Sequence, residues 1–146
     1  MKKLWRLNRV ERGLLIQALL GVMAARIMLP VLPLSKVRRM LWRLLSAEQP
    51  LAAGRRCTAE RVAWAVAAAE KHAPSGSTCL ASALAGQALF RRHGYETHLR
   101  IGVKWGLGRT FAAHAWLERQ DRIVLGGPAS FVGQYQALPD VEHLIL

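Results

Sequence analysis

Acidic residues and cysteines are scarce in this sequence of 146 residues. Nine Asp and Glu stand against 21 Lys and Arg, which gives a net charge of +12. Only two residues are aspartates, Asp121 and Asp140. Two cysteines, Cys57 and Cys79, are too few for a disulfide framework, so the sequence favours a reducing compartment and a cytoplasmic location.

Several kinds of binding site are missing as well. The sequence has no zinc-ligand spacing, no helix-turn-helix signature and no alternation of aromatic and basic residues of the RNA-binding type. Nucleic acid is therefore not expected as a partner, despite an isoelectric point near 11.2. We predict no metal and no cofactor. Four histidines without ligand spacing are expected at helix ends or on the surface: His72, His93, His98 and His143.

The basic charge is concentrated in the first part of the chain. Residues 1–56 hold 12 Lys and Arg and two Glu, whereas residues 57–146 hold nine Lys and Arg and seven Asp and Glu. Apolar residues make up 52% of the chain, which excludes a disordered protein. We therefore predict a basic, apolar helical region over residues 1–56, with an anionic partner, followed by a globular domain over residues 57–146.

The apolar stretch over residues 13–34 allows three interpretations: a secretory signal peptide, a membrane span, or a helix that packs on protein or lies on a membrane. Glu11 and Gln17 are unusual in a signal peptide. Arg26 inside a span would cost roughly 2.5–3.5 kcal/mol. These features favour the third interpretation, with Pro30 and Pro33 ending the helix.

A second short helix is expected over residues 35–45. It is amphipathic and basic, with Val37, Leu41, Leu44 and Leu45 on one side. It either completes a helical hairpin over the core or forms a docking face for a protein or an anionic membrane surface. Residues 48–56 then form a loop or linker.

Two further helices are expected over residues 58–72 and 79–93. Thr58 has the side chain of an N-cap residue, and Pro74 stops the first helix. Ser77 or Thr78 can cap the second helix, which ends at Gly94 and has small residues that allow close packing against a sheet. The first helix should bury one apolar stripe, Val62, Ala65, Val66 and Ala69, and the second one face, Leu80, Ala83, Leu84, Gln87 and Ala88.

The residue pattern then changes from helical to alternating. Strands are expected over residues 97–105, 110–119 and 122–125, with a turn over residues 106–109 and a two-residue turn at Gln120-Asp121. Helices followed by an antiparallel meander predict an α+β fold.

Cys79 and His114 are the candidate catalytic pair. Cys79 follows a Gly/Pro/Ser-rich loop at a helix N-terminus, where the helix dipole favours a thiolate, although a buried structural thiol is the alternative. Alternation places His114, Trp116 and Glu118 on one face of a strand. A cysteine at a helix start and a histidine on a following strand is the arrangement of a papain-like thiol site. Cys57 has no such companion and is interpreted as a non-catalytic thiol.

Four segments carry a family resemblance: Thr78-Cys79-Leu80, Arg91-Arg92-His93-Gly94-Tyr95, Arg100-Ile101-Gly102-Val103 and Ala113-His114-Ala115-Trp116-Leu117-Glu118. Over residues 57–138 the chain resembles the transglutaminase-like peptidases of lasso-peptide biosynthesis, in the stand-alone form. The resemblance implies a papain/transglutaminase-type fold that removes the leader peptide from a ribosomally made precursor. It further implies Cys79 as nucleophile, His114 as general base and acid, a separate leader-recognition protein and a lasso cyclase.

The sequence departs from the family at the third catalytic position. The family has an Asp about twelve residues after the histidine, where this chain reads Leu125-Gly126-Gly127-Pro128. With the turn at Gln120-Asp121, His114 would pair across from Gly127. Asp121 would lie ~20 Å and Glu118 ~13 Å away along the strand, too far to orient the ring. The third member is therefore unassigned: a backbone carbonyl or a water orients His114, or the turn lies elsewhere.

Three alternatives to a peptidase stay open. The missing Asp is compatible with a non-catalytic scaffold of the same fold. A thiol acyltransferase would pass the acyl group to an amine instead of water. A membrane-surface protein would depend on the first 45 residues, with peripheral contact to an anionic membrane.

Overall fold

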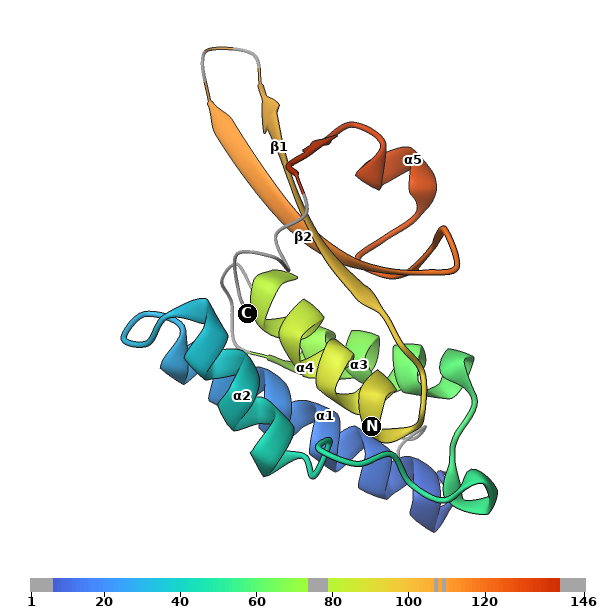
Figure 1. Cartoon of the computed structure of the whole chain (residues 1–146). Helices are drawn as coiled ribbons and strands as arrows, with labels where there is room; N and C mark the ends of the chain where they lie inside the picture. The colour runs from blue at the N-terminus through green and yellow to red at the C-terminus, as the bar shows by residue number, and fades with distance from the viewer. Residues whose placement is uncertain (1–6, 74–78, 107, 109, 140–146) are drawn as a thin grey trace.

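The computed structural model describes residues 7–73, 79–106, 108 and 110–139. The chain forms helices and one antiparallel sheet of four strands in the order β3-β2-β1-β4, which confirms the expected α+β class. Figure 1 shows helices α1 to α4 in one body and the β1–β2 hairpin extending from it, with the short helix α5 beside the hairpin. The elements in chain order are α1 (Arg9–Met28), α2 (Leu34–Leu44), the short 3-10 helix η2 (Ala53–Arg55), α3 (Ala59–His72), α4 (Cys79–Arg92), β1 (His98–Trp105), β2 (Phe111–Arg119), β3 (Arg122–Leu125), α5 (Ala129–Val132) and β4 (Gln136–Ala137).

The N-terminal helices α1 and α2 form a hairpin. A capping box starts α1, because the Asn8 side chain accepts the Glu11 N–H and the Glu11 carboxylate accepts the Asn8 N–H. The predicted break at the prolines is confirmed. Val37, Leu41 and Leu45, three of the four residues on the predicted apolar side of α2, are buried. Leu44, seven residues after Val37, is the last residue of the helix and is 55% exposed. Among the described residues, no helix is both long and apolar enough to cross a membrane.

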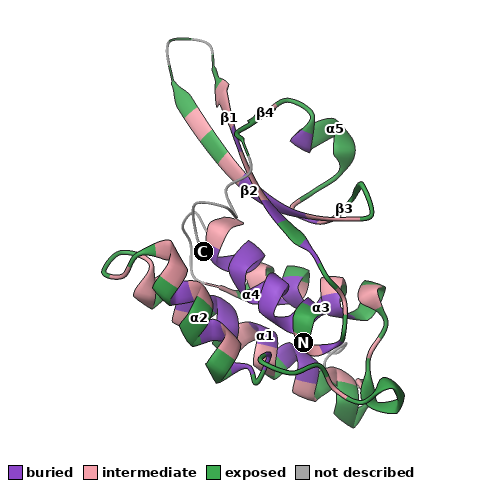
Figure 2. Cartoon of the chain, viewed as in Figure 1, coloured by how far each residue is buried: buried purple, intermediate pink, exposed green. Residues whose placement is uncertain are grey.

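Helices α3 and α4 begin and end close to the predicted positions. The Thr58 hydroxyl accepts the Arg61 N–H at 3.3 Å, and the predicted apolar stripe of α3 is buried. All ten residues from 81 to 90 are buried, so α4 is surrounded on every side and not on one face only, as Figure 2 shows. Packing of α4 against the sheet was expected, but α4 also packs closely against α1. A Cβ added at Gly21 of α1 would lie 3.1 Å from the Cβ of Ala85 in α4.

Strand β2 is the strand against which α4 packs. It pairs with the whole of β1, from His98↔Glu118 to Trp105↔Phe111. The predicted turn at Gln120-Asp121 is confirmed, with φ values of 51° and 60° that suit the tight hairpin turn. The short elements α5 and β4 were not predicted. Strand β4 pairs with the outer edge of β1 at Gly102 and Val103.

One hydrophobic core joins the two parts of the chain. It runs from Leu14 of α1 through Leu84 and Phe90 of α4 to Leu117 and Leu125 of the sheet. The boundary predicted between residues 56 and 57 is not tested by this arrangement and stays a prediction.

Candidate active site

Cys79 and His114 line the same pocket, which has a volume of about 250 Å³. Cys79 is half-buried as the first residue of α4, and its predicted cap residues, Ser77 and Thr78, lie outside the described residues. His114 comes from the middle of β2 and is also half-buried. The pocket thus receives a thiol from a helix start and an imidazole from a strand, and the remaining lining residues are Ala67, Glu70, Ser82, Ala83, Ala115, Leu125, Gly126, Gly127 and Phe131.

The imidazole of His114 is oriented by the backbone. Its Nε2 atom lies 2.6 Å from the carbonyl oxygen of Gly126. Because a carbonyl oxygen only accepts hydrogen bonds, Nε2 carries the proton in this contact. In the neutral ring the lone pair is therefore on Nδ1, the nitrogen that can take a proton from a thiol. The backbone carbonyl, one of the alternatives that the sequence left open, thus lies at hydrogen-bond distance from the ring.

Gly126 stands twelve residues after His114, at the spacing expected for the family's Asp. Its φ of 116° is unfavourable for other residues, and an added Cβ would lie 2.4 Å from the Cβ of Trp116. A β-bulge helps to place Gly126 next to β2. Glu118 pairs with Ile123 whereas Leu117 pairs with Leu125, so the register shifts by one residue between Leu117 and Glu118. This shift of one residue brings Gly126 beside Trp116. The predicted alignment of His114 with Gly127 is therefore wrong.

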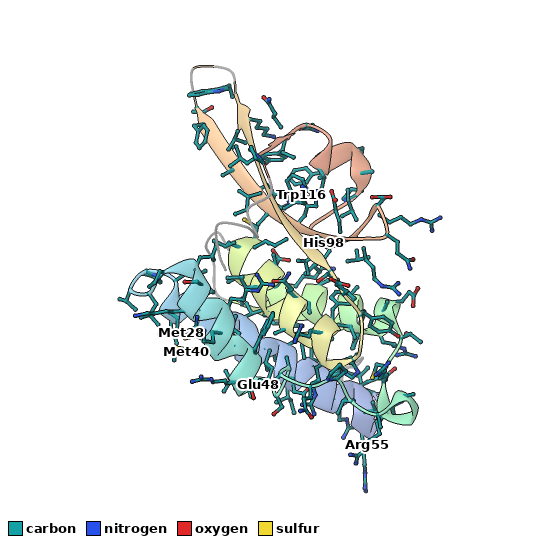
Figure 3. All side chains as sticks on the ribbon, viewed as in Figure 1. Met28, Met40, Glu48, Arg55, His98 and Trp116 are labelled. Atoms are coloured by element: carbon teal, nitrogen blue, oxygen red, sulfur yellow. The ribbon has the colours of Figure 1, made fainter. Side chains whose placement is uncertain are left out.

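Three aromatic rings surround the imidazole of His114. The ring of Trp116 stacks at 6.2 Å from that of His114, and the rings of Phe131 and Tyr135 lie 5.1 and 5.3 Å away. Phe131 belongs to α5 and Tyr135 follows it, so the unpredicted segment after β3 holds the histidine. Figure 3 shows Trp116 on β2 beside this segment.

Glu118 shares the face of His114, as predicted, but has other partners. Its carboxylate accepts the Trp116 indole N–H at 3.0 Å and a hydrogen bond from Arg100 at 3.3 Å. Asp121 is exposed in the hairpin turn, and Asp140 lies outside the described residues. Glu118 and Asp121, which were expected to lie too far from His114 to orient its ring, therefore do not take the place of the Gly126 carbonyl.

Glu70 and Ser82 are pocket residues that the sequence analysis missed. Glu70 brings a carboxylate from the last turn of α3. Ser82 lies three residues after Cys79 on α4, and its hydroxyl is buried without a hydrogen-bond partner in the described structure. A signal for both was present in the sequence, because each polar side chain is close to the loop that leads into Cys79.

Cys57 and His93 meet at a second place, away from the pocket. The Cys57 N–H donates to Nδ1 of His93 at 2.9 Å, and the Tyr95 hydroxyl donates to the Cys57 carbonyl at 2.8 Å. His93 follows α4, as expected for a helix-end residue, but it is buried. Burial, together with the charges of Arg92 and Arg56, lowers the pKa of His93.

Among the described residues, the other predicted histidines lie outside the pocket lined by Cys79 and His114. His72 and His98 are exposed, in agreement with the prediction, and His143 lies outside the described residues. Within the described ranges, no group of three His, Cys, Asp or Glu side chains is arranged to hold a metal ion.

The comparison with known proteins gives one match. A family model described as the transglutaminase-like superfamily matches residues 19–139. No curated protein and no solved structure matches the chain. The matched residues cover most of the chain and include Cys79, His114 and Gly126, and the chain therefore belongs to the transglutaminase-like superfamily.

Proposed function

We propose that this protein is a cysteine peptidase that removes the leader peptide from a ribosomally made lasso-peptide precursor before macrolactam cyclisation. The observation that carries the proposal is that Cys79 and His114 line one and the same pocket, with Nε2 of His114 held at the carbonyl of Gly126. The superfamily includes cysteine peptidases and acyltransferases, which supports thiol chemistry in this pocket. The finer assignment comes from the sequence resemblance.

In the proposed reaction His114 acts first as a base. Nδ1 takes the thiol proton of Cys79, and the thiolate attacks the carbonyl carbon of the peptide bond after the leader. The N–H groups in the first turn of α4 lie at the positive end of the helix dipole, so they can stabilise the oxyanion. His114 then gives its proton to the leaving amine of the core peptide, and water hydrolyses the thioester that joins the leader to Cys79.

The Gly126 carbonyl affects the expected rate of this reaction because it takes the place of a catalytic carboxylate. It orients the ring as a carboxylate does, but it is neutral and stabilises the imidazolium less strongly. We therefore expect slower turnover than a peptidase with a Cys-His-Asp triad would show. Slow turnover is sufficient when a second protein holds the substrate at the active site. We propose that a separate leader-recognition protein presents the precursor in this way. We also propose that a cyclase then uses the new amino terminus of the core peptide.

Mass spectrometry of a lasso precursor tests the proposal. The precursor is incubated with its leader-recognition protein and either the wild-type enzyme or Cys79→Ala. We expect free leader and free core peptide with the wild type only. Equal cleavage by both proteins would contradict the proposal.

Two other outcomes correspond to the alternative functions. Leader joined to an added amine, instead of free leader acid, would indicate a thiol acyltransferase. No cleavage by the wild type, with binding of the recognition protein demonstrated, would favour a non-catalytic scaffold.

A further inference from the structure

Helix α1 is apolar on two opposite faces. Its inner face is buried against α3 and α4 and consists of Leu14, Leu15, Ala18, Gly21, Val22 and Ala25. Its outer face carries a second apolar row, which we call the outer stripe: Ile16, Leu20, Met23 and Ile27, with exposed fractions of 56%, 57%, 36% and 70%. Steps of four, three and four residues place these side chains along one line of the helix.

The outer stripe continues beyond the helix and is not covered within the described structure. Val31, in the turn between α1 and α2, is 76% exposed. Both α1 and α2 pack on α4 and on each other, so they form one layer (Figure 1). The exposed fractions of the outer stripe show that it takes no part in this packing. An exposed apolar row of this length on a folded protein marks a surface that contacts something else.

The helix paired with α1, α2, carries an exposed row of basic residues, which we call the basic row. In α2 the side opposite the buried Val37 and Leu41 presents Lys36, Arg39 and Arg43, all exposed. Of these, Arg43 pairs with Glu48 at 3.6 Å. Residues 9–44 contain seven Lys and Arg and a single acidic residue, Glu11. The Glu11 side chain is only 13% exposed and is paired with Arg61, so it does not offset this charge.

The charge of this layer decides between possible occupants. A second copy of the chain would bring two basic rows together, which costs electrostatic energy. A bilayer with anionic headgroups accepts both kinds of side chain at once, because apolar groups enter the headgroup region while Lys and Arg reach the lipid phosphates. We propose that the α1–α2 layer binds an anionic membrane surface peripherally, through the outer stripe and the basic row.

Flotation of the full-length protein with lipid vesicles tests this proposal independently of any peptidase activity. We expect binding to phosphatidylglycerol vesicles and little binding to phosphatidylcholine vesicles. Leu20→Glu, in the outer stripe, should weaken binding at least about tenfold, because an apolar side chain that enters the headgroup region becomes an anion. Leu138→Glu is the matched control: Leu138 is 40% exposed after β4, so its substitution should leave binding unchanged.

The basic row has its own test. Replacing both Lys36 and Arg39 with Gln should weaken binding about fivefold for each charge removed and reduce its salt dependence. Circular dichroism would verify that each variant is folded. Absence of wild-type flotation with phosphatidylglycerol would overturn the proposal and leave the outer stripe to a protein partner, and unchanged binding of folded Leu20→Glu would overturn it equally.

Discussion

The Nε2 atom of His114 lies 2.6 Å from the carbonyl oxygen of Gly126, so a backbone group occupies the place where relatives of this fold are expected to have a carboxylate. Gly126→Ala should move this carbonyl, because the added Cβ would collide with Trp116. We expect leader cleavage to fall at least about tenfold, since a displaced ring loses its orientation. Gly54→Ala is the control, because a Cβ there meets no atom within 4 Å. Equal activity of the two variants would show that the carbonyl contact is unimportant.

Glu70 and His114 line the same pocket but should differ in importance. His114→Ala removes the proposed general base and should lower cleavage by roughly 10²–10⁴-fold. Glu70→Gln keeps the size of the side chain, and because Gly126 already holds Nε2 we expect a change of less than about threefold. Cleavage rates of both variants, measured on the same precursor, check this difference. A large loss in Glu70→Gln would identify that carboxylate as the missing acidic member of the site.

Two helical glycines should respond in opposite directions to substitution by alanine. Gly13 in α1 has open space around its Cα, so Gly13→Ala should raise stability by about 0.5–1 kcal/mol. At Gly86 in α4 the new Cβ would lie 2.7 Å from a methyl group of Leu125, so Gly86→Ala should overpack the core and lower stability by about 1 kcal/mol or more. Thermal unfolding of both variants checks this prediction, with an expected change in melting temperature of about 2–4 °C per kcal/mol. A rise in both melting temperatures would refute the close packing of α4 on the sheet.

Protonation of His93 should destabilise the fold in mild acid. Burial and the neighbouring charges of Arg92 and Arg56 lower the pKa of His93 below its usual 6.5, so the unfolded chain binds this proton more readily than the folded one. Stability from this group is therefore full above about pH 6.5 and is lost as the pH falls toward the lowered pKa. The melting temperature should drop between about pH 7.5 and about pH 5.5. His93→Gln, which keeps an acceptor for the Cys57 N–H, should show a smaller drop over the same range.

Local signals in the sequence were sufficient for most of the fold. The Thr58 cap, Gly94 after α4 and the Gln120-Asp121 turn are short-range features, and each marks the boundary of an element in the structure. The alternation in β2 likewise placed His114, Trp116 and Glu118 on one face. These features depend only on neighbouring residues, which is why a single sequence reveals them.

The parts that were missed depend on contacts between distant residues. Strand β4 has two residues, too few for a periodic pattern, and forms only because it meets the edge of β1. The role of Gly126 belongs to its backbone carbonyl, which every residue type has, so no side chain indicated it. The burial of His93 comes from the approach of Cys57, 36 residues earlier in the chain.

The central position of α4 has a consequence for how this protein can change during evolution. On one side Gly21 of α1 approaches Ala85 so closely that a Cβ would stand 3.1 Å away, and on the other Gly86 faces Leu117 and Leu125. Exchange of α1 alone with that of a relative would bring foreign side chains into a contact with no spare room. The helices before residue 57 and the helix that begins at Cys79 should therefore be inherited as a unit, and hybrids between relatives should fold only when both come from the same parent.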